Sequence, residues 1–223
     1  MERHFERDLE ELKERLLWMG SLAERSVYQA VHAVLEADEN LAHAVLNEEN
    51  TINELQIEID DRVVQLLALQ QLMATDLRFV LAIARINNDL ERIGDQAVNI
   101  AQSAQRIVRH PPVKPYVDLP RMGELAEKMM RDSLDSLVRR DVDLARSVLS
   151  RDDQVDQLRD QIFRELLTYM MGSSSGVFPA FELILVAQNL ERTADHATNV
   201  AEDVIYMVAR SDVRHPAVDR HTA

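Results

Sequence analysis

Apolar residues recur at intervals of three and four along most of this chain, which is the spacing of helices that bury one face. In the first half, apolar stripes cover residues 5–23, 41–66 and 83–107. In the second half, the pattern predicts helices from about 120 to 140, 142 to 171 and 179 to 210. Only 4% of residues are aromatic and five are glycine, which also favours helices over sheet. We predict an all-α protein without strands.

Two segments of the chain are repeated in the same order. LERIGDQAVNIA at 90–101 and LERTADHATNVA at 190–201 share seven of twelve positions. LAHAVLNEENTINEL at 41–55 resembles LARSVLSRDDQVDQL at 144–158, with nearly the same offset. Repeats of this length indicate duplicated structural units. The chain is therefore predicted to form two similar three-helix bundles from an internal duplication, joined end to end.

Proline placement predicts the limits of the two units. The first 110 residues contain no proline, and four of the six prolines lie in the stretch 111–120. Such a stretch cannot continue a helix and is expected to be an extended connector. We predict a first bundle at 1–110, the connector at 111–120, a second bundle at 121–211 and a disordered tail at 212–223.

Composition and charge exclude several classes of protein. The chain has no cysteine, so disulfides, thiolate metal sites and thiol catalysis are ruled out together. A net charge of −14 argues against a nucleic-acid binder. Residues 1–15 are charged throughout, which does not suit a signal peptide, and no apolar stretch is long enough to cross a bilayer. We expect a cytoplasmic protein without membrane insertion.

Both copies of the repeat place two carboxylates four residues apart, at Glu91/Asp95 and Glu191/Asp195. On a helix this spacing puts both acids on one face, where like charges repel, so a cation is the simplest partner. A solvated surface face is the alternative, with Arg92 and Arg192 neutralising the acids. His196 is expected on the helix surface or behind a ligand, because its counterpart is Gln96.

Further acids and amides lie near these motifs. Glu49 and Asp152 each interrupt an apolar stripe, where an uncompensated charge would cost several kcal/mol. Carboxylate and amide oxygens suit Fe, Mn, Zn or Mg without choosing among them. On the third helix, Arg78, Arg85 and Arg92 step by seven and form a basic row that either contacts an acidic partner or is solvated.

The chain contains no catalytic signature. Glu-x-x-His is absent, as are the phosphate-binding loop Gly-x-x-x-x-Gly-Lys-Ser/Thr and the nucleophile motif Gly-x-Ser-x-Gly. We therefore predict that the protein is not an enzyme. Three functions remain to be weighed: an adaptor in signalling, a metal-buffering bundle without a signalling role, and a metal-dependent hydrolase or oxidase.

The two copies of the LER motif, together with QQLMATDLR at 70–78, resemble the PhoU family, whose members regulate bacterial phosphate uptake. The resemblance covers roughly residues 4–210. It implies two similar three-helix bundles, and an adaptor that represses phosphate-starvation genes by coupling the ATPase of the phosphate transporter to a sensor histidine kinase. A homodimer is also expected.

The same resemblance implies metal clusters on paired acidic motifs. The residues implied are Glu49, Asn53, Glu91 and Asp95 in the first half, and Asp152, Asp156, Glu191 and Asp195 in the second. The sequence departs from the family pattern at Met73, at Thr193-Ala194 and at Asn53. Asn53 replaces an acid, so unequal metal loading of the two halves is expected.

Overall fold

The computed structural model describes residues 2–69, 72–110, 113, 116–172 and 174–209. Helices account for 93% of these residues, and none of them is in a strand. The predicted all-α class is therefore confirmed. The predicted tail at 212–223 lies outside the described residues, as do positions 111–112 and 114–115 of the predicted connector.

The first bundle consists of three long helices, α1 (Glu2–Glu36), α2 (Glu39–Leu69) and α3 (Ala74–Ile107). Their apolar stripes are buried as the spacing predicts: Ile52, Ile59 and Ile83 are each at most 2% exposed. α1 ends where Ala37 adopts a positive φ of 54°, and the Asp38 carboxylate accepts a hydrogen bond from the Asn40 N–H at 2.7 Å. The chain reverses there, so α1 and α2 pack as antiparallel neighbours.

The second bundle consists of α4 (Asp118–Arg139), α5 (Val142–Leu149), α6 (Asp152–Gly172), the short 3₁₀ helix η1 (Ser174–Gly176) and α7 (Val177–Ala209). The single helix predicted over 142–171 is wrong, because it is divided at Ser150 and Arg151. At the break, the Arg151 N–H donates to the Val148 carbonyl and the Gln154 N–H donates to the Arg151 carbonyl, each at 3.0 Å. Bonds between residues three apart thus replace the four-residue bonds of the α-helix, whereas α2 continues unbroken through the equivalent positions.

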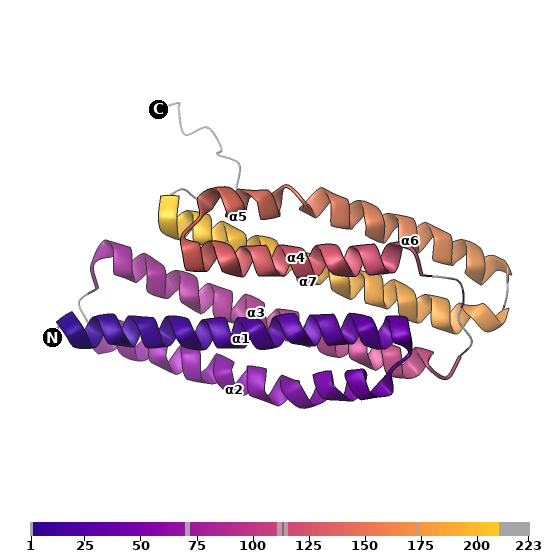
Figure 1. The fold of residues 1–223 in the computed structure, drawn as a ribbon, viewed down its shortest axis with the longest axis horizontal. Coiled ribbons are helices and arrows are strands. Elements are labelled where there is room, and N and C mark those ends of the chain that lie inside the picture. Colours follow the sequence, from indigo (N-terminus) through magenta and orange to yellow (C-terminus); the bar gives the residue numbers. More distant parts are fainter. Residues whose placement is uncertain (1, 70–71, 111–112, 114–115, 173, 210–223) are drawn as a thin grey trace, which may run out of the picture.

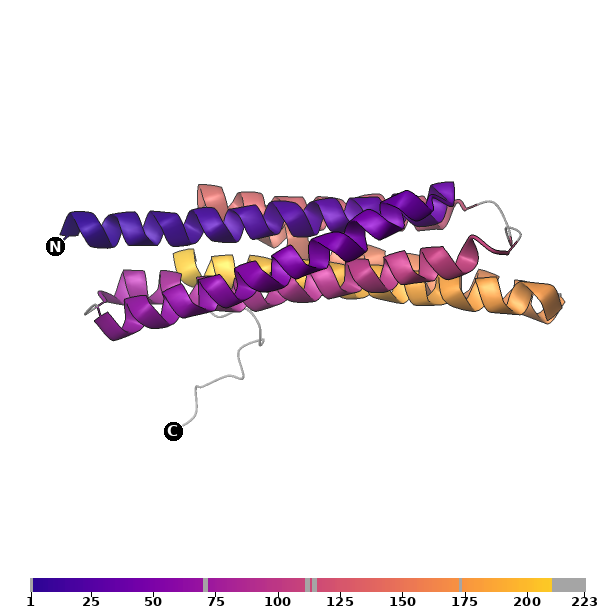
Figure 2. The same ribbon diagram turned by 90° about the horizontal axis from the view of Figure 1, so that it is seen from below.

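The two bundles lie side by side, so the end-to-end arrangement predicted from the sequence is wrong (Figure 1). α3 and α7 make the most extensive contact between any two helices and run antiparallel along each other (Figure 2). Both helices are buried on most of their sides, whereas a helix that packs only within one bundle would leave one side exposed to solvent.

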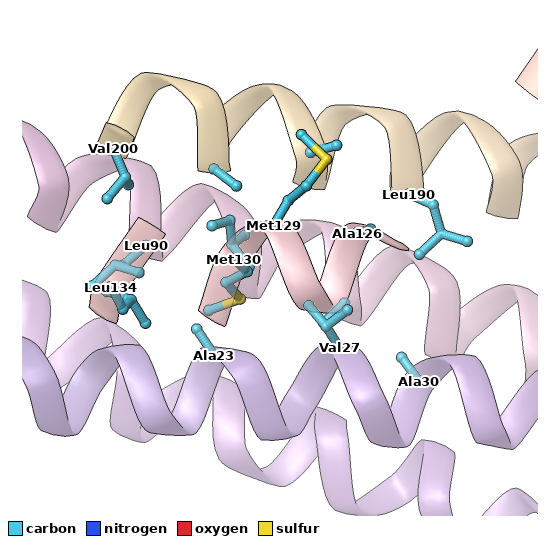
Figure 3. Packing of buried hydrophobic residues seen from close by; sticks show 14 of the residues in the cluster. Ala23, Val27, Ala30, Leu90, Ala126, Met129, Met130, Leu134, Leu190 and Val200 are labelled. Atoms are coloured by element: carbon cyan, nitrogen blue, oxygen red, sulfur yellow. The ribbon is translucent and has the colours of Figure 1, made fainter. Parts of the chain in front are cut away.

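α1 and α4 form a second contact between the halves. Ala23 and Val27 of α1 face Met130 of α4 in the apolar layer between the bundles (Figure 3). A glycine on each helix makes room for the partner: a Cβ on Gly20 would lie 2.8 Å from Leu134, and one on Gly123 would lie 2.9 Å from Val31. The core is thus continuous across both halves.

This close approach predicts the effect of a methyl group at Gly123. Val31 is 3% exposed and too short to swing away, so Gly123→Ala overpacks the contact by about 1–3 kcal/mol. Better helix propensity offsets about 0.5–1 kcal/mol of this loss. Urea unfolding should show a net loss of stability, whereas Gly172→Ala, with open space around it, should change stability by less than about 0.5 kcal/mol. Equal midpoints for the two variants would contradict the α1–α4 packing.

Candidate functional site

The second half brings its predicted acids together on one face of α6 and α7. Asp152 and Asp156 lie on the first turns of α6, and Glu191 and Asp195 lie near the middle of α7. Asp156 influences the protonation of the other three carboxyls, and Asp195 influences both Asp152 and Glu191. The pairing of helices expected from the motifs is therefore present in this half.

Burial and mutual repulsion both disfavour the charged form of these acids. Burial raises the pKa of Glu191, and the nearby Asp195 and Asp156 raise it further. The pKa of Asp152 is raised by burial and then by Asp195 and Asp156. Asp195 is exposed as a residue, yet partial burial of its carboxyl and the nearby Asp156 raise its pKa as well. The cluster carries more negative charge than its surroundings compensate.

An arginine from α6 lies among these acids. The Arg159 guanidinium is 3.6 Å from Glu191, 3.8 Å from Asp156 and 3.1 Å from Asp160. Its Nε is buried and makes no hydrogen bond to any described residue. Arg159 therefore shares its positive charge among three carboxylates while its Nε–H has no acceptor. The repulsion between the acids is only partly relieved.

In the first half, the corresponding acids on α3 pair with a neighbour on their own helix. Arg92 lies 3.4 Å from Glu91 and 3.2 Å from Asp95. Glu91 Oε2 is nevertheless buried without hydrogen-bond geometry to any described donor. Burial raises the pKa of Glu91, as does Asp95, against the influence of Arg92 and His196. Glu91 is thus a partly buried carboxylate whose negative charge is incompletely compensated.

Glu49 and Asn53 flank a residue of α2 that packs tightly against α3. The Ile52 side chain lies 3.3 Å from the position that a Cβ on Gly94 would occupy. Asn53 adjoins Ile52 and Glu49 lies one turn before it, so the packing sets this part of α2 beside the 91–95 segment. Both side chains are partly buried. The described contacts do not join either side chain to Glu91 or Asp95, so a shared site remains a prediction.

Polar pairs run along the contact between α3 and α7. Arg106 forms a bidentate ion pair with Glu182, with both hydrogen bonds at 2.8 Å. Arg85 donates a hydrogen bond to Asp203 at 3.0 Å. Arg85 also lies over the Tyr206 ring, and Arg92 pairs with Asp95. These two arginines of the basic row are therefore engaged in contacts within the protein.

His196 also belongs to the contact between the two helices. Its Nδ1 lies 2.8 Å from Asp89, and Asn199 donates to the same carboxylate oxygen at 3.1 Å. His196 also acts on the protonation of Glu91 across the contact and of Asp195 on its own helix. It therefore lies near both acidic faces and pairs with Asp89, a partner that the sequence did not predict.

The donor types suit a hard or borderline cation, because every predicted ligand is a carboxylate or amide oxygen. The buried, unbonded Glu91 oxygen and the raised pKa values of the second-half acids both favour added positive charge. In this arrangement, however, no three acidic or histidine side chains among the described residues converge closely enough to hold an ion. The residues fit the chemistry of a metal, and side-chain movement would be needed to close its coordination.

Sequence reasoning missed two contributors to the site. Arg159 follows Asp152 and Asp156 at helical spacing, so extending the acidic motif by one turn would have found it. The pairing of Asp89 with His196 joins residues 107 positions apart. No local pattern signals that contact.

Known proteins resemble this chain along nearly all of its length. The model of the PhoU domain matches twice, at residues 16–104 and 119–204. A Pseudomonas putida protein named phosphate-specific transport system accessory protein PhoU homolog is 40% identical over 220 residues, which is 98% of this chain and 86% of the relative. A homolog of the same name from Clostridium acetobutylicum is 40% identical over 213 residues, covering 94% and 96% of the two chains.

Solved structures agree with the sequence relatives. The crystal structure of PhoU from Pseudomonas aeruginosa superimposes with a TM-score of 0.90 at 38% identity, covering 93% of this chain and 100% of the other. The phosphate transport system regulatory protein PhoU from Streptococcus pneumoniae gives a TM-score of 0.85 at 28% identity, covering 94% and 99%. The fold of two similar three-helix bundles is therefore confirmed.

The raised pKa of Glu191 predicts how Glu191→Gln changes stability with pH. The folded protein disfavours the charged carboxylate above its raised pKa, and protonation removes that cost as the pH falls below it. In chelator at pH 8, Glu191→Gln should unfold about 1–2 °C higher than the parent, a shift typical of a few tenths of a kcal/mol. The difference should shrink as the pH falls towards the ordinary value near 4.5.

Exposed Glu124 provides the matched control for this prediction. Glu124→Gln makes the same chemical change outside the cluster, and its unfolding temperature should follow that of the parent at each pH. If Glu191→Gln is instead less stable than the parent at pH 8, the contact with Arg159 outweighs burial and repulsion.

Proposed function

This chain belongs to the PhoU family, and from that membership we propose that it is a negative regulator of phosphate uptake and of the phosphate-starvation response. In this role it is an adaptor between the ATPase subunit of a phosphate transporter and a sensor histidine kinase. The names of the relatives support an accessory role in phosphate transport. The two partners are part of the proposal, as are a homodimer and a cytoplasmic location. Among the described residues, no helix is long and apolar enough to span a membrane.

The proposal rests on the cluster of mutually repelling carboxylates on α6 and α7, part of which is repeated on α3. Asp152, Asp156, Glu191 and Asp195 would hold a metal in the second half. Glu49, Asn53, Glu91 and Asp95 would do so in the first half, with one carboxylate fewer. A bound Fe, Mn, Zn or Mg ion would supply positive charge and link two helices.

The chain's own residues determine what such a cluster can do. Its acids lack a neighbouring nucleophile or a phosphate-binding loop, which argues for a docking surface rather than a catalytic centre. Without a cation, the acidic face repels another acidic surface. When the charge is neutralised, the same rigid helices can accept a partner's carboxylates or dock by shape. The protein is accordingly proposed to be an adaptor and not an enzyme.

A metal-buffering bundle without a signalling role is the alternative. Two acidic faces on one chain suit this alternative, since each could hold metal without a docked partner. The alternatives differ in partner binding: a buffer would bind metal without contacting the transporter ATPase or the kinase.

A paired substitution separates metal binding from partner binding. Glu191→Ala with Asp195→Ala removes both α7 carboxylates, and should lower bound metal in the second half at least tenfold, as loss of metal-site residues usually does. Binding to the transporter ATPase and to the kinase cytoplasmic region should weaken in pull-downs, with helicity unchanged by circular dichroism. Glu10→Ala with Glu14→Ala, two exposed acids at the same spacing on α1, should alter neither. Metal loss with partner binding at parent strength would refute the docking mechanism and favour the buffer.

Arg159 should compete with a metal for the same carboxylates. Arg159→Gln removes a guanidinium that lies 3.6–3.8 Å from Glu191 and Asp156, so the acids should attract a divalent ion more strongly. Titration with Mn²⁺ at pH 7.5 should show several-fold tighter binding, whereas Arg164→Gln on the exposed side of α6 should bind as the parent does. Weaker binding by Arg159→Gln would mean that the arginine supports the site.

A further inference from the structure

The end of α6 from Phe163 and the start of α7 up to Ile184 form a tip with an apolar surface. The two helices run side by side to the end of the molecule at which η1 lies between them, and there they project beyond the helices of the first bundle (Figures 1 and 2). On α6, Phe163, Leu167 and Met171 follow one another at steps of four, and each is at least 40% exposed. Val177 and Phe181 of α7 have the same spacing and similar exposure. Each helix of the tip therefore presents an apolar stripe to solvent.

The two stripes meet along a groove of about 280 Å³. Phe163 of α6 lines it together with Ile184 and Ala187 of α7. Because α6 and α7 are antiparallel, the next turn towards η1 places Leu167 beside Phe181. The stripes therefore form one continuous apolar surface with a hollow in it.

The first half closes the equivalent place with a polar bridge. The Asn87 side chain of α3 donates to the Asp60 carboxylate at 2.9 Å and to the Gln56 carbonyl at 3.0 Å, both on α2. In the register of the repeats, Ala187 stands at the position of Asn87, and Phe163 stands at that of Asp60. The groove is thus a difference between the halves: a polar pair that joins two helices is replaced by a methyl group and an exposed aromatic ring.

The tip also lacks the cover that α1 gives to the first half. In the register that pairs the two glycines of the α1–α4 contact, Asp118 at the start of α4 is the counterpart of Arg15. The part of α1 before Arg15 therefore has no equivalent in α4. Leu66 of α2 is 7% exposed beside that part of α1, whereas its counterpart Tyr169 on α6 is 42% exposed. The tip consequently exposes apolar side chains on more than one side.

The charge of the chain favours contact between two such tips. No charged residue lies between Glu165 and Glu182, although 29% of the chain is charged. With a net charge of −14, two copies that meet through acidic surfaces repel each other, whereas an uncharged apolar surface can meet its own copy without that cost. Interface cores are likewise depleted of charge and enriched in aromatic residues and methionine.

Helix packing points to the same occupant. An antiparallel pair of helices with one exposed apolar face is half of a four-helix bundle. A second, identical pair related by a two-fold axis completes the bundle, because the same surface serves both sides of the contact.

We propose that the α6–α7 tip binds the same tip of a second copy of this chain about a two-fold axis. Leu167 and Phe181 lie one turn from the groove, and a bulky side chain from this turn of each copy fills the groove of the other. The inference rests on the homodimer of the proposed function and identifies the surface that forms it.

Sedimentation equilibrium of the full chain in chelator tests the interface. Phe163→Asp with Ala187→Asn installs the polar pair of Asp60 and Asn87, which this fold accommodates at the equivalent place. The parent should sediment as a dimer at micromolar concentration. The dimer dissociation constant of the double variant should rise at least about tenfold, because the contact would then enclose a carboxylate.

A matched pair of single variants shows whether the tip itself is responsible. Leu167→Asp should weaken the dimer at least about tenfold as well, whereas Val64→Asp, at the counterpart position of α2, should dimerise as the parent does. Circular dichroism should show the parent's helicity in all variants. A dimer of parent strength in the double variant and in Leu167→Asp would overturn the proposal, and so would equal weakening by Val64→Asp.

The outcome can be separated from that of the adaptor role. A parent that dimerises through this tip but binds neither the transporter ATPase nor the kinase would refute the adaptor and leave the interface in place. A parent that is monomeric at about 100 μM would overturn the interface. If Leu167→Asp then weakened binding to the ATPase, the tip would be a site for that partner instead of for a second copy.

Discussion

The antiparallel contact between α3 and α7 is the constraint on which the rest of the molecule depends. Each helix packs within its own bundle and against the other bundle, so both are buried on most sides. Such a contact needs paired charges where polar groups are enclosed. The Arg106–Glu182 and Asp89–His196 pairs meet this need.

The acidic faces follow from this arrangement. With the inner faces of α3 and α7 committed to each other, Glu191 is directed towards α6 of its own bundle, where Arg159 lies 3.6 Å away. In the second half, α6 adds two more carboxylates and Arg159, so charges of both signs crowd a partly buried surface. The resulting repulsion raises several pKa values and makes the face responsive to any added cation.

The two halves have diverged while keeping their packing. Gly94 admits the large Ile52 side chain, whereas Ala194 and the smaller Val155 stand at the equivalent positions, and all three side chains named are buried. A methyl gained on one helix is thus matched by a methyl lost on its neighbour, a change that cores tolerate. The departure from the family pattern at residue 194 therefore has a local physical reason.

The sequence by itself determined the helices, the duplication and the acidic motifs, because helical spacing and repeats are local properties. It placed the predicted ligands Glu191 and Asp195 on one helix face for the same reason. Only the tertiary structure decided that the bundles lie side by side, that Asp89 meets His196 and that Arg159 stands among the acids of two helices. Those outcomes depend on which buried faces find each other in space, and spacing along one helix does not specify its partner. The break at Ser150 was likewise hidden, because the apolar spacing continues across it from Val148 to Val155, and both of these residues are buried.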